Sequence, residues 1–308
     1  MSTATVTRLN PARLALYAKF VRVYIVDGPL AMSVGLVAAL AQVPPSLEAL
    51  AKGAWMLGLG TLLFYLVHCL DDITGFKTGT DRATAARKAR IGEPKLLASG
   101  DISLAEARAI AKVLAAASSF LLLGVVWTAP WYVSLTAVAA IIVTGQYSYA
   151  AKWSYRGLGE LTVVLNFACC VVMPYLYITE TLSWELVAIA LEYGLFVVVI
   201  TFSSNLADME EDAATGRRSL CVLLGHRRVT RLLYALLVMI WASVILLVLS
   251  GTLPWFAAAL LLLLPVHVDA ARAFSRGEAQ RARAAAFTAA RRNGLGLIGC
   301  ILSSALGA

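Results

Sequence analysis

The segment WELVAIALEYGLFVVVITFSSNLADMEEDAATGRR, residues 184–218, decides how this chain folds. Its first part, residues 184–206, is almost entirely apolar and is long enough to cross a bilayer as a helix, which takes about 20 residues. Charged residues follow it directly: Asp208, Glu210, Glu211, Asp212, Arg217 and Arg218. The segment therefore predicts a membrane-spanning helix with a charged site at its end.

The rest of the chain repeats this apolar character. It has 308 residues, of which 60% are hydrophobic and 14% charged, with a mean hydropathy of +0.79. Soluble domains carry roughly a quarter charged residues. We therefore expect an all-α, polytopic membrane bundle in a single domain, residues 1–308. About nine transmembrane helices are expected, at residues 20–43, 48–70, 104–127, 129–147, 158–178, 184–206, 229–250, 253–271 and 286–306.

The connections between these segments alternate in charge. Short ones are nearly free of Lys and Arg, whereas the long ones are basic: residues 77–95, 152–156, 217–231 and 272–292. The positive-inside rule puts the long connections and the N-terminus in the cytoplasm, and nine spans then put the C-terminus outside. We expect an integral protein of a bacterial inner membrane. The net charge of +8 lies in these connections rather than in a soluble basic domain, so no nucleic-acid partner is expected.

The acidic residues after residue 206 have a spacing that suits a metal. If the helix continues through them, Asp208 and Asp212 lie on one face, because they are four residues apart. Mg²⁺ takes oxygen ligands, commonly one or two carboxylates plus substrate phosphates. Asn205 adds an oxygen one turn earlier, and Arg217 and Arg218 suit a phosphate. The alternative is a solvated, charged helix end, which is common.

A second acidic segment follows the apolar residues 48–70. Asp71 and Asp72 end that helix, where charge is costly, and the glycines that follow let the chain turn and bring Asp81 back. Lys77 and Arg82 are interleaved with these acids. Both acidic segments are expected on the same membrane face. Together they form a plausible socket for a Mg²⁺-bound diphosphate, which is then a good leaving group.

Four segments resemble the UbiA superfamily of membrane prenyltransferases, and most of all the branch that prenylates dihydroxynaphthoate. They are DDITGFKTGTD (71–81), RIGEPKLLASGDISLAEA (90–107), YSYAAKWSYRGLGEL (147–161) and SNLADMEEDAATGRRSLCVLLG (204–225). The first and last are similar to the two acidic motifs of the family. The resemblance covers nearly the full length of the chain.

The resemblance implies nine helices, an active site under cytoplasmic loops, and a Mg²⁺ cofactor that holds a prenyl diphosphate. The prenyl tail lies in an apolar tunnel, and a small acceptor captures the allylic cation. By position, the implied metal ligands are Asp72, Asp81, Asp208 and Asp212, with Asp71 as a replacement carboxylate. The implied diphosphate-binding residues are Lys77, Arg82, Arg90, Lys95, Lys152, Arg217 and Arg218, with Asn205 orienting the second motif.

The chain departs from the family pattern at the reacting end. Gly75 replaces the second acid of the first motif, His68 replaces an upstream Asn, and Ala207 replaces an Arg before the second motif. Val23 stands where the family has Pro after Arg22. These departures favour a specialised enzyme over one with the usual quinone substrate.

Three polar residues near these motifs have competing interpretations. His68 is a candidate catalytic acid or base one turn before Asp72, or a hydrogen-bonded residue of the bundle. Asp27 lies in the first expected span, where it is either functional or paired with a neighbour such as Arg22. Glu160 is expected to hold the loop with Arg156 rather than to do chemistry.

Three functions stay open from the sequence. A Mg²⁺-dependent prenyltransferase that uses a prenyl diphosphate and a small acceptor is favoured. A terpene cyclase on the same scaffold needs no acceptor. A transporter or non-catalytic membrane protein is disfavoured, because the acids gather at helix ends rather than at mid-bilayer.

Overall fold

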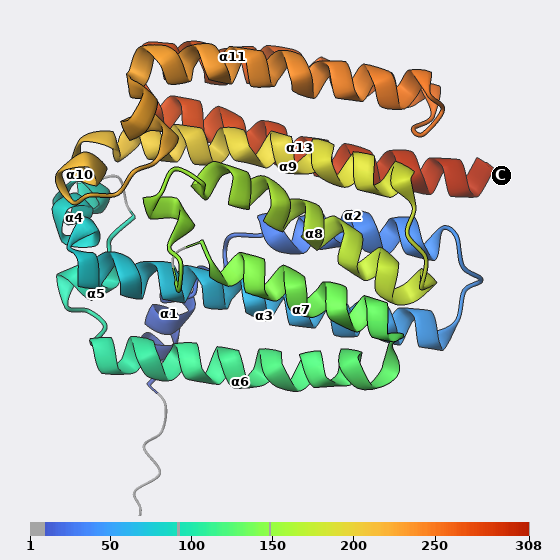
Figure 1. Cartoon of the computed structure of the whole chain (residues 1–308), viewed down its shortest axis with the longest axis horizontal. Coiled ribbons are helices and arrows are strands. Elements are labelled where there is room, and N and C mark those ends of the chain that lie inside the picture. The colour runs from blue at the N-terminus through green and yellow to red at the C-terminus, as the bar shows by residue number, and fades with distance from the viewer. Residues whose placement is uncertain (1–9, 91–92, 148, 308) are drawn as a thin grey trace, which may run out of the picture.

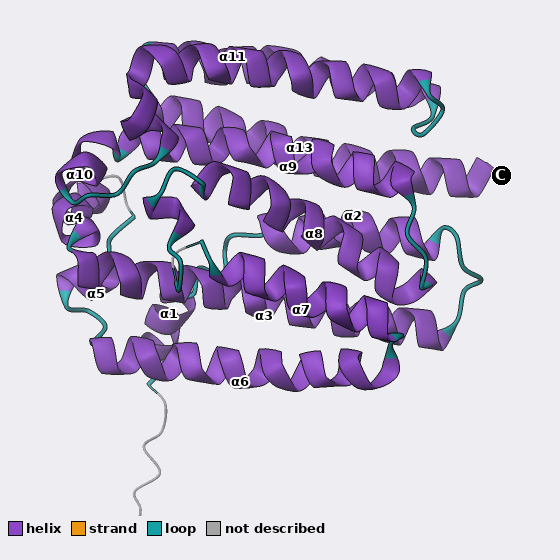
Figure 2. Ribbon diagram, viewed as in Figure 1, coloured by secondary structure: helices purple, strands orange, loops and turns teal. Residues whose placement is uncertain are grey.

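The computed structural model describes residues 10–90, 93–147 and 149–307. Within these ranges the chain is helical and contains no strand, as Figure 2 shows. The helices, labelled in Figure 1 where there is room, are α1 (Pro11–Phe20), α2 (Asp27–Leu40), α3 (Leu47–Thr78), α4 (Thr80–Arg90), α5 (Leu96–Ser99), α6 (Leu104–Thr128), α7 (Trp131–Gly145), η1 (Trp153–Tyr155), α8 (Gly159–Thr179), α9 (Trp184–Ala207), α10 (Met209–Ala214), α11 (Leu220–Leu249), η2 (Trp255–Leu263), α12 (Leu264–Ser275) and α13 (Ala279–Gly307).

The expectation of an all-α membrane bundle is confirmed. Six described segments are long and apolar enough to cross a membrane: α3, α6, α8, α9, α11, and η2 together with α12. Two shorter apolar helices, α2 and α7, lie where further spans are expected, as does α13. The number nine stays a prediction, because three of the expected spans do not meet the length and composition of a crossing helix.

The first expected span, residues 20–43, differs most from the structure. Its helix begins only at Asp27, after a turn over residues 21–26 in which Arg22 adopts a positive φ of 61°. This left-handed conformation is uncommon outside glycine and interrupts the helix. The apolar residues therefore form a shorter helix, and Arg22 is left free to turn toward the neighbouring α3.

Close helix packing around α9 and α8 forms the centre of the bundle. Tyr193, Phe196 and Phe202 of α9 are almost fully buried. Gly35 lets α2 approach α8 so closely that a Cβ there would sit 1.7 Å from the carbonyl oxygen of Val171. Small residues at such contacts are typical of membrane helices. Helix α8 contacts both α3 and α9, and α4 contacts α10, so this packing connects the elements that carry the two acidic segments.

Both acidic segments lie at the same end of the bundle. Figure 1 places α4, α10, the end of α3 and the start of α11 together at that end. The α9 helix stops at Ala207, and Asp208, with φ −103° and ψ 7°, separates it from α10. The condition that the helix continues unbroken through Asp208 and Asp212 is therefore not met. The break frees Asp208 from the helix, although its carbonyl oxygen still accepts a hydrogen bond from the backbone nitrogen of Asp212 at 2.8 Å.

Candidate active site

A cavity of about 900 Å³ opens between these helices. Residues of both acidic segments line one part of it, among them Asp71, Asp72, Asp81 and Asp208. Apolar residues line the rest, including Met56, Leu59, Leu63, Phe64, Phe167 and Met173. Met56 precedes Asp72 by sixteen residues on α3, which at about 1.5 Å per residue is roughly 24 Å along the helix. The cavity thus joins a charged end to a long apolar interior.

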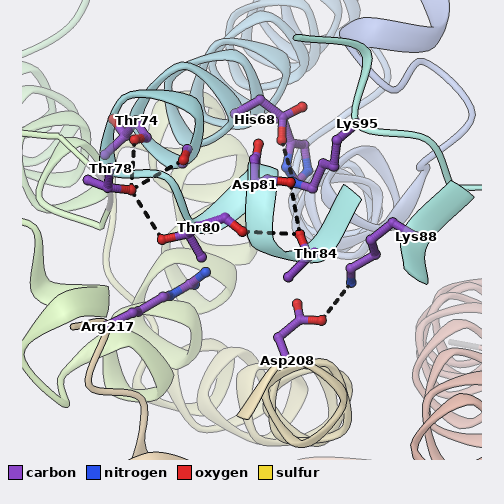
Figure 3. Close-up of polar contacts among 12 residues, drawn as sticks. His68, Thr74, Thr78, Thr80, Asp81, Thr84, Lys88, Lys95, Asp208 and Arg217 are labelled. Carbon is purple, nitrogen blue, oxygen red and sulfur yellow. Dashed lines mark hydrogen bonds and ion pairs between the residues drawn. The ribbon is translucent and has the colours of Figure 1, made fainter. Parts of the chain in front are cut away.

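The first cluster consists of Asp72, Asp81, Lys95 and Arg22. The Nζ of Lys95 donates to Asp72 Oδ1 at 2.9 Å and lies 2.8 Å from Asp81 Oδ1. Arg22 Nη2 donates to the same Asp72 oxygen at 2.6 Å. Figure 3 shows Lys95 reaching across to Asp81. One lysine therefore connects two carboxylates that come from different helices.

Gly75 makes this first cluster possible. A Cβ built on Gly75 would lie 2.7 Å from Asp81 Oδ1, closer than side-chain atoms normally approach. The turn at Gly79, which has a φ of +87°, then returns the chain so that α4 brings Asp81 against α3. Gly75, where the resemblance leads us to expect an acid, thus leaves space for the Asp81 carboxylate of the next helix.

Burial and charge act in opposite directions on this cluster. Burial raises the pKa of Asp81 to about 6, and Lys95 opposes that increase. Burial lowers the pKa of Lys95, but the carboxylates of Asp72 and Asp81 outweigh burial and leave it above its ordinary value. Lys95 is therefore held as a cation between the two acids.

The second cluster consists of Asp208, Glu211, Arg87 and Lys88. Lys88 Nζ lies 3.0 Å from Asp208 Oδ1. Figure 3 marks this ion pair with a dashed line. Arg87 pairs with Asp208 and, through Nε, with Glu211 at 2.9 Å. Burial acts to raise the pKa of Asp208, but the two cations lower it below its ordinary value. Asp208 is thus an ionised carboxylate at the cavity wall.

Asp212 lies behind this cluster and does not line the cavity. It is fully buried, and neither of its carboxylate oxygens has a hydrogen-bond partner among the described residues. Its nearest cation is Arg217, whose Nε lies 3.8 Å from Oδ2. Burial raises the pKa of Asp212 to about 6. Such a group has oxygen acceptors that the protein itself leaves unused.

Glu160 and Asn205 support the second acidic segment from within the bundle. Asn205 Nδ2 donates to Glu160 Oε1 at 2.8 Å, and the backbone nitrogen of Leu220 donates to the same oxygen at 3.1 Å. Glu160 therefore holds the two chain segments that flank Asp208 and Asp212. The structural role expected of Glu160 agrees with these hydrogen bonds, but its partners are Asn205 and Leu220 rather than Arg156.

Of the sequence-predicted cations, Lys95 and Arg217 line the cavity. The others do not line it and are exposed: Lys77, Arg82, Arg90, Lys152 and Arg218. Two of them lie over aromatic rings instead. Arg82 is 4.6 Å from the ring centre of Phe76, and Lys152 Nζ is 5.8 Å from that of Tyr155.

The sequence analysis does not select several cations that line the cavity as candidates for binding the diphosphate. They are Arg22, Lys88, Arg283 and Arg291. A signal for Lys88 was present. Asp81, Thr84 and Lys88 recur at the spacing of one helical face and are buried, whereas Arg82 and Arg90 lie off that face. Helical periodicity across residues 80–90 would have selected Lys88.

His68 and Asp27 also lie at the cavity wall. The Nε2 of His68 is buried and has no hydrogen-bond partner among the described residues, while Nδ1 lies 3.5 Å from Arg22. Asp27 is held by both Nε and Nη2 of Arg291, at 3.0 and 2.9 Å. The suggested pairing of Asp27 with Arg22 is therefore wrong, because the ion pair instead joins α2 to α13.

The donor set fits a hard divalent cation that binds together with a substrate. Within the described residues, no group of three or more His, Cys, Asp or Glu side chains is placed to hold a metal alone. Mg²⁺ is usually held by one or two carboxylates plus substrate phosphates, so it does not need such a group. Asp72 and Asp208 offer carboxylate oxygens at the cavity, and Asp212 has two buried oxygens without a partner.

Comparison with known sequences places these features in a family. Residues 29–294 match the UbiA prenyltransferase family. The chain is 32% identical over 216 residues to the 1,4-dihydroxy-2-naphthoate octaprenyltransferase of Mycobacterium tuberculosis, covering 66% of this chain and 68% of that protein. It is 27% identical to the Bacillus subtilis enzyme of the same name, covering 48% of each.

A third relative is the 2-carboxy-1,4-naphthoquinone phytyltransferase of Synechocystis, which is 28% identical and covers 50% of this chain and 53% of that one. The chain thus spans about half the length of the Bacillus and Synechocystis relatives. The fold is similar to that of a UbiA homolog from Aeropyrum pernix, with a TM-score of 0.68 at 19% identity, covering 92% and 98% of the two chains.

A further solved structure, of a UbiA homolog from Archaeoglobus fulgidus bound to GPP and Mg²⁺, superposes with a TM-score of 0.57 at 15% identity, covering 76% and 78%. At such identity the likeness concerns the fold. The family match extends over most of the chain, and the two acidic segments that first indicated it face one cavity. This integral membrane protein belongs to the UbiA prenyltransferase family.

Proposed function

We propose that the protein is a Mg²⁺-dependent intramembrane prenyltransferase, which moves an isoprenyl group from its diphosphate to a small aromatic acceptor. One observation carries the proposal. Two acidic segments, more than a hundred residues apart in the chain, face the charged end of a single cavity whose remainder is apolar. A prenyl diphosphate has the same division into a charged head and an apolar tail.

The diphosphate head binds at the charged end, where Lys88, Lys95 and Arg217 supply positive charge. Asp72 and Asp208 hold Mg²⁺ against the diphosphate, with Asp71, Asp81 and Asp212 as further carboxylates close to those two in the chain or in space. Bound Mg²⁺ neutralises the charge that develops on the departing diphosphate. Lys95 and Lys88 keep the carboxylates ordered before the substrate arrives.

The remaining site residues of the sequence prediction take supporting roles in this proposal. Asn205 orients the second acidic segment through Glu160. The exposed cations approach the diphosphate through movement of the elements that carry them, which are the end of α3 for Lys77, α4 for Arg82 and Arg90, and connections for Lys152 and Arg218.

The apolar part of the cavity takes the prenyl tail and excludes water from the reacting carbon. The bond between the first prenyl carbon and the diphosphate oxygen breaks, and both electrons leave with the diphosphate. Phe64 and Phe167 present aromatic rings in the cavity wall, which stabilise a cation by their electron-rich faces. The acceptor ring donates an electron pair to the allylic carbon and then loses a proton, for which Nδ1 of His68 is the proposed acceptor, because the donor Arg22 Nη1 lies 3.5 Å from it and leaves the hydrogen of the neutral ring on Nε2.

The first acceptor to test is a hydroxylated naphthoate. The relatives from Mycobacterium tuberculosis and Bacillus subtilis are named for 1,4-dihydroxy-2-naphthoate, and the Synechocystis relative for a carboxynaphthoquinone. The departures at Gly75 and His68 lie close to the reacting end, so related phenols and indoles belong in the same panel.

We place the charged end of the cavity, with the N-terminus, on the cytoplasmic side of a bacterial inner membrane, and the C-terminus outside. The basic connections support this orientation, because α4, α10 and the start of α11 lie at the charged end of the bundle (Figure 1). Cytoplasmic exposure gives the site access to diphosphates and Mg²⁺.

The test incubates the purified full-length protein with geranyl, farnesyl or geranylgeranyl diphosphate and Mg²⁺, with and without dihydroxynaphthoate, and identifies products by mass spectrometry. We expect a prenylated acceptor that disappears when EDTA removes Mg²⁺. Glu210→Gln, an exposed acid of the same segment, is the matched control and keeps activity. A cyclic hydrocarbon formed without acceptor would replace the proposal with a terpene cyclase, and a lack of diphosphate release from every substrate would contradict both.

A further inference from the structure

A second, smaller cavity of about 390 Å³ lies at the outer surface of the bundle, where the start of α11 meets the end of α12. It shares no lining residue with the first cavity and contains no acidic residue. Its lining consists of polar and cationic side chains: His226, Arg227, Thr230, Arg231, Tyr234 and Ser275. The imidazole Nε2 of His226 donates to the carbonyl oxygen of Phe274 at 2.8 Å and fixes one helix against the other.

The two arginines of this cavity lack the ion pairs found elsewhere at this end of the bundle. Arg227 and Arg231 are exposed, and neither makes an ion pair within the part of the chain that the structure describes. The nearby acids of α12 and of the connection to α13 are already engaged, Asp269 by Arg281 and Glu278 by Arg276 and Arg281. Like charges four residues apart on a helix repel each other, so an anion from outside the chain would stabilise them.

The face of α11 that carries these arginines continues as a lipid-facing surface. At 100° per residue, Arg227, Arg231 and Tyr234 lie on the same side as Val238 and Leu249. Val238 is 71% exposed and Leu249 78% exposed, and α11 is one of the helices that can cross a membrane. One face therefore presents cations first, then a tyrosine, and then apolar side chains. This order matches the headgroup, interface and acyl chain of a phospholipid.

We propose that this face of α11 binds one anionic phospholipid from the leaflet at the active-site end. Its phosphate lies in the small cavity against Arg227 and Arg231, and an acyl chain follows the helix past Val238. The apolar continuation of the face favours a lipid over a soluble phosphate, which would gain nothing from it. Basic pockets between membrane helices on the cytoplasmic side are suited to such headgroups.

The test uses delipidated full-length protein in detergent and counts bound lipid by native mass spectrometry. Phosphatidylglycerol is compared with phosphatidylcholine of the same acyl chains, and inorganic phosphate is added as a competitor. We expect preferential retention of one phosphatidylglycerol. The double variant Arg227→Ala/Arg231→Ala weakens its binding by roughly thirtyfold, because each cation near a membrane surface contributes about a factor of five.

The matched control is Arg108→Ala/Lys112→Ala, which removes two exposed cations of the same spacing from α6. Neither residue lines either cavity. We expect this control to keep the bound lipid. Arg227→Lys/Arg231→Lys retains the charge and should also keep the lipid, which shows that the loss in the alanine variant comes from the missing charge and not from misfolding. Equal retention of the two lipids, equal loss in the α6 control, or displacement of the lipid by inorganic phosphate would each overturn the proposal.

Discussion

The two acidic clusters at the cavity face the same space but are built differently. The second cluster joins two short segments: Asp208 and Glu211 lie within one turn of each other, and their cations Arg87 and Lys88 are adjacent in the chain, although 121 residues separate Arg87 from Asp208. The first is assembled from distant parts, since Lys95 reaches Asp72 across 23 residues and Arg22 reaches it across 50. Each half of the second cluster is therefore visible in a short motif, whereas the first cluster takes single residues from several places; both need the fold to bring acids and cations together.

This difference accompanies the departures that the resemblance leads us to expect, which fall on Gly75 in the first motif and spare Asn205, Asp208 and Asp212 in the second. The second segment retains its Asn and both Asp at the expected spacing, because Asn205, Asp208 and Asp212 are positioned by one chain segment. In the first segment Gly75 replaces an acid, and the carboxylate of Asp81 packs against the space that it leaves. We infer that tertiary structure allows the first cluster to vary in sequence while it still presents two carboxylates to the cavity.

The largest expected effect tests whether both clusters are needed. Asp72→Asn and Asp208→Asn should each lower the rate of diphosphate release by roughly a thousandfold or more, because each removes a charged ligand for the metal that stabilises the leaving group. The rate is measured with a phosphate-coupled assay on the purified protein. Full activity in either variant would show that its cluster is not part of the site.

The next prediction compares the lysines of the two clusters. Lys95→Gln should reduce kcat/KM for the prenyl diphosphate by about a hundredfold, because Lys95 bridges two carboxylates. Lys88→Gln should cost only about tenfold, because Lys88 serves Asp208 alone and Arg87 remains beside it. Steady-state kinetics on both variants decide the matter, and a larger loss at Lys88 would reverse the assigned roles.

A subtler change tests how the first cluster is assembled. Gly75→Ala should lower kcat by about tenfold while the melting temperature stays near that of the wild type. The added Cβ would lie 2.7 Å from Asp81 Oδ1, so the Asp81 carboxylate has to move away from its position in the cluster. Gly145→Ala is the matched control, since a Cβ there meets no atom within 4 Å. Unchanged kinetics in Gly75→Ala would mean that the position of Asp81 does not matter.

The smallest effect is expected at the rim of the second cluster. Arg87 is 32% exposed in its side chain, and ion pairs with that access to solvent contribute little. Arg87→Ala should therefore lower activity by only about two- to fivefold, and the deficit should shrink at high salt, where the wild-type pair is screened. Activity measured across a salt series tests this, and a deficit that is large at every salt concentration would assign Arg87 to substrate binding.

The sequence predicts the membrane helices well wherever an apolar run ends in a defined cap. The helix expected at residues 104–127 is Leu104–Thr128, whose start is fixed by a capping box between Ser103 and Glu106. The helix expected at residues 184–206 is Trp184–Ala207, which Ser183 caps. By contrast, the turn that shortens the first span depends on the backbone conformation of Arg22, which no residue pattern signals.

The site is predicted less completely, and for a physical reason. Asp72 and Asp208 follow from charges beside apolar segments, and both line the cavity, although the expectation that Asp72 ends its helix is wrong because α3 continues to Thr78. The partners of these acids do not follow, because they depend on which helices pack together. Arg22 meets Asp72, and Arg291 meets Asp27, across tens to hundreds of residues that carry no local signal.

The measurement that most directly tests joint action of the two clusters is a double-mutant cycle. Calorimetry measures how tightly an unreactive prenyl thiodiphosphate binds in the presence of Mg²⁺ to the wild type, Asp72→Asn, Asp208→Asn and the double variant. If both carboxylates hold one metal-bound diphosphate, each single change should cost nearly as much affinity as the double change. Independent, additive losses would contradict a shared site and would separate the two clusters into different functions.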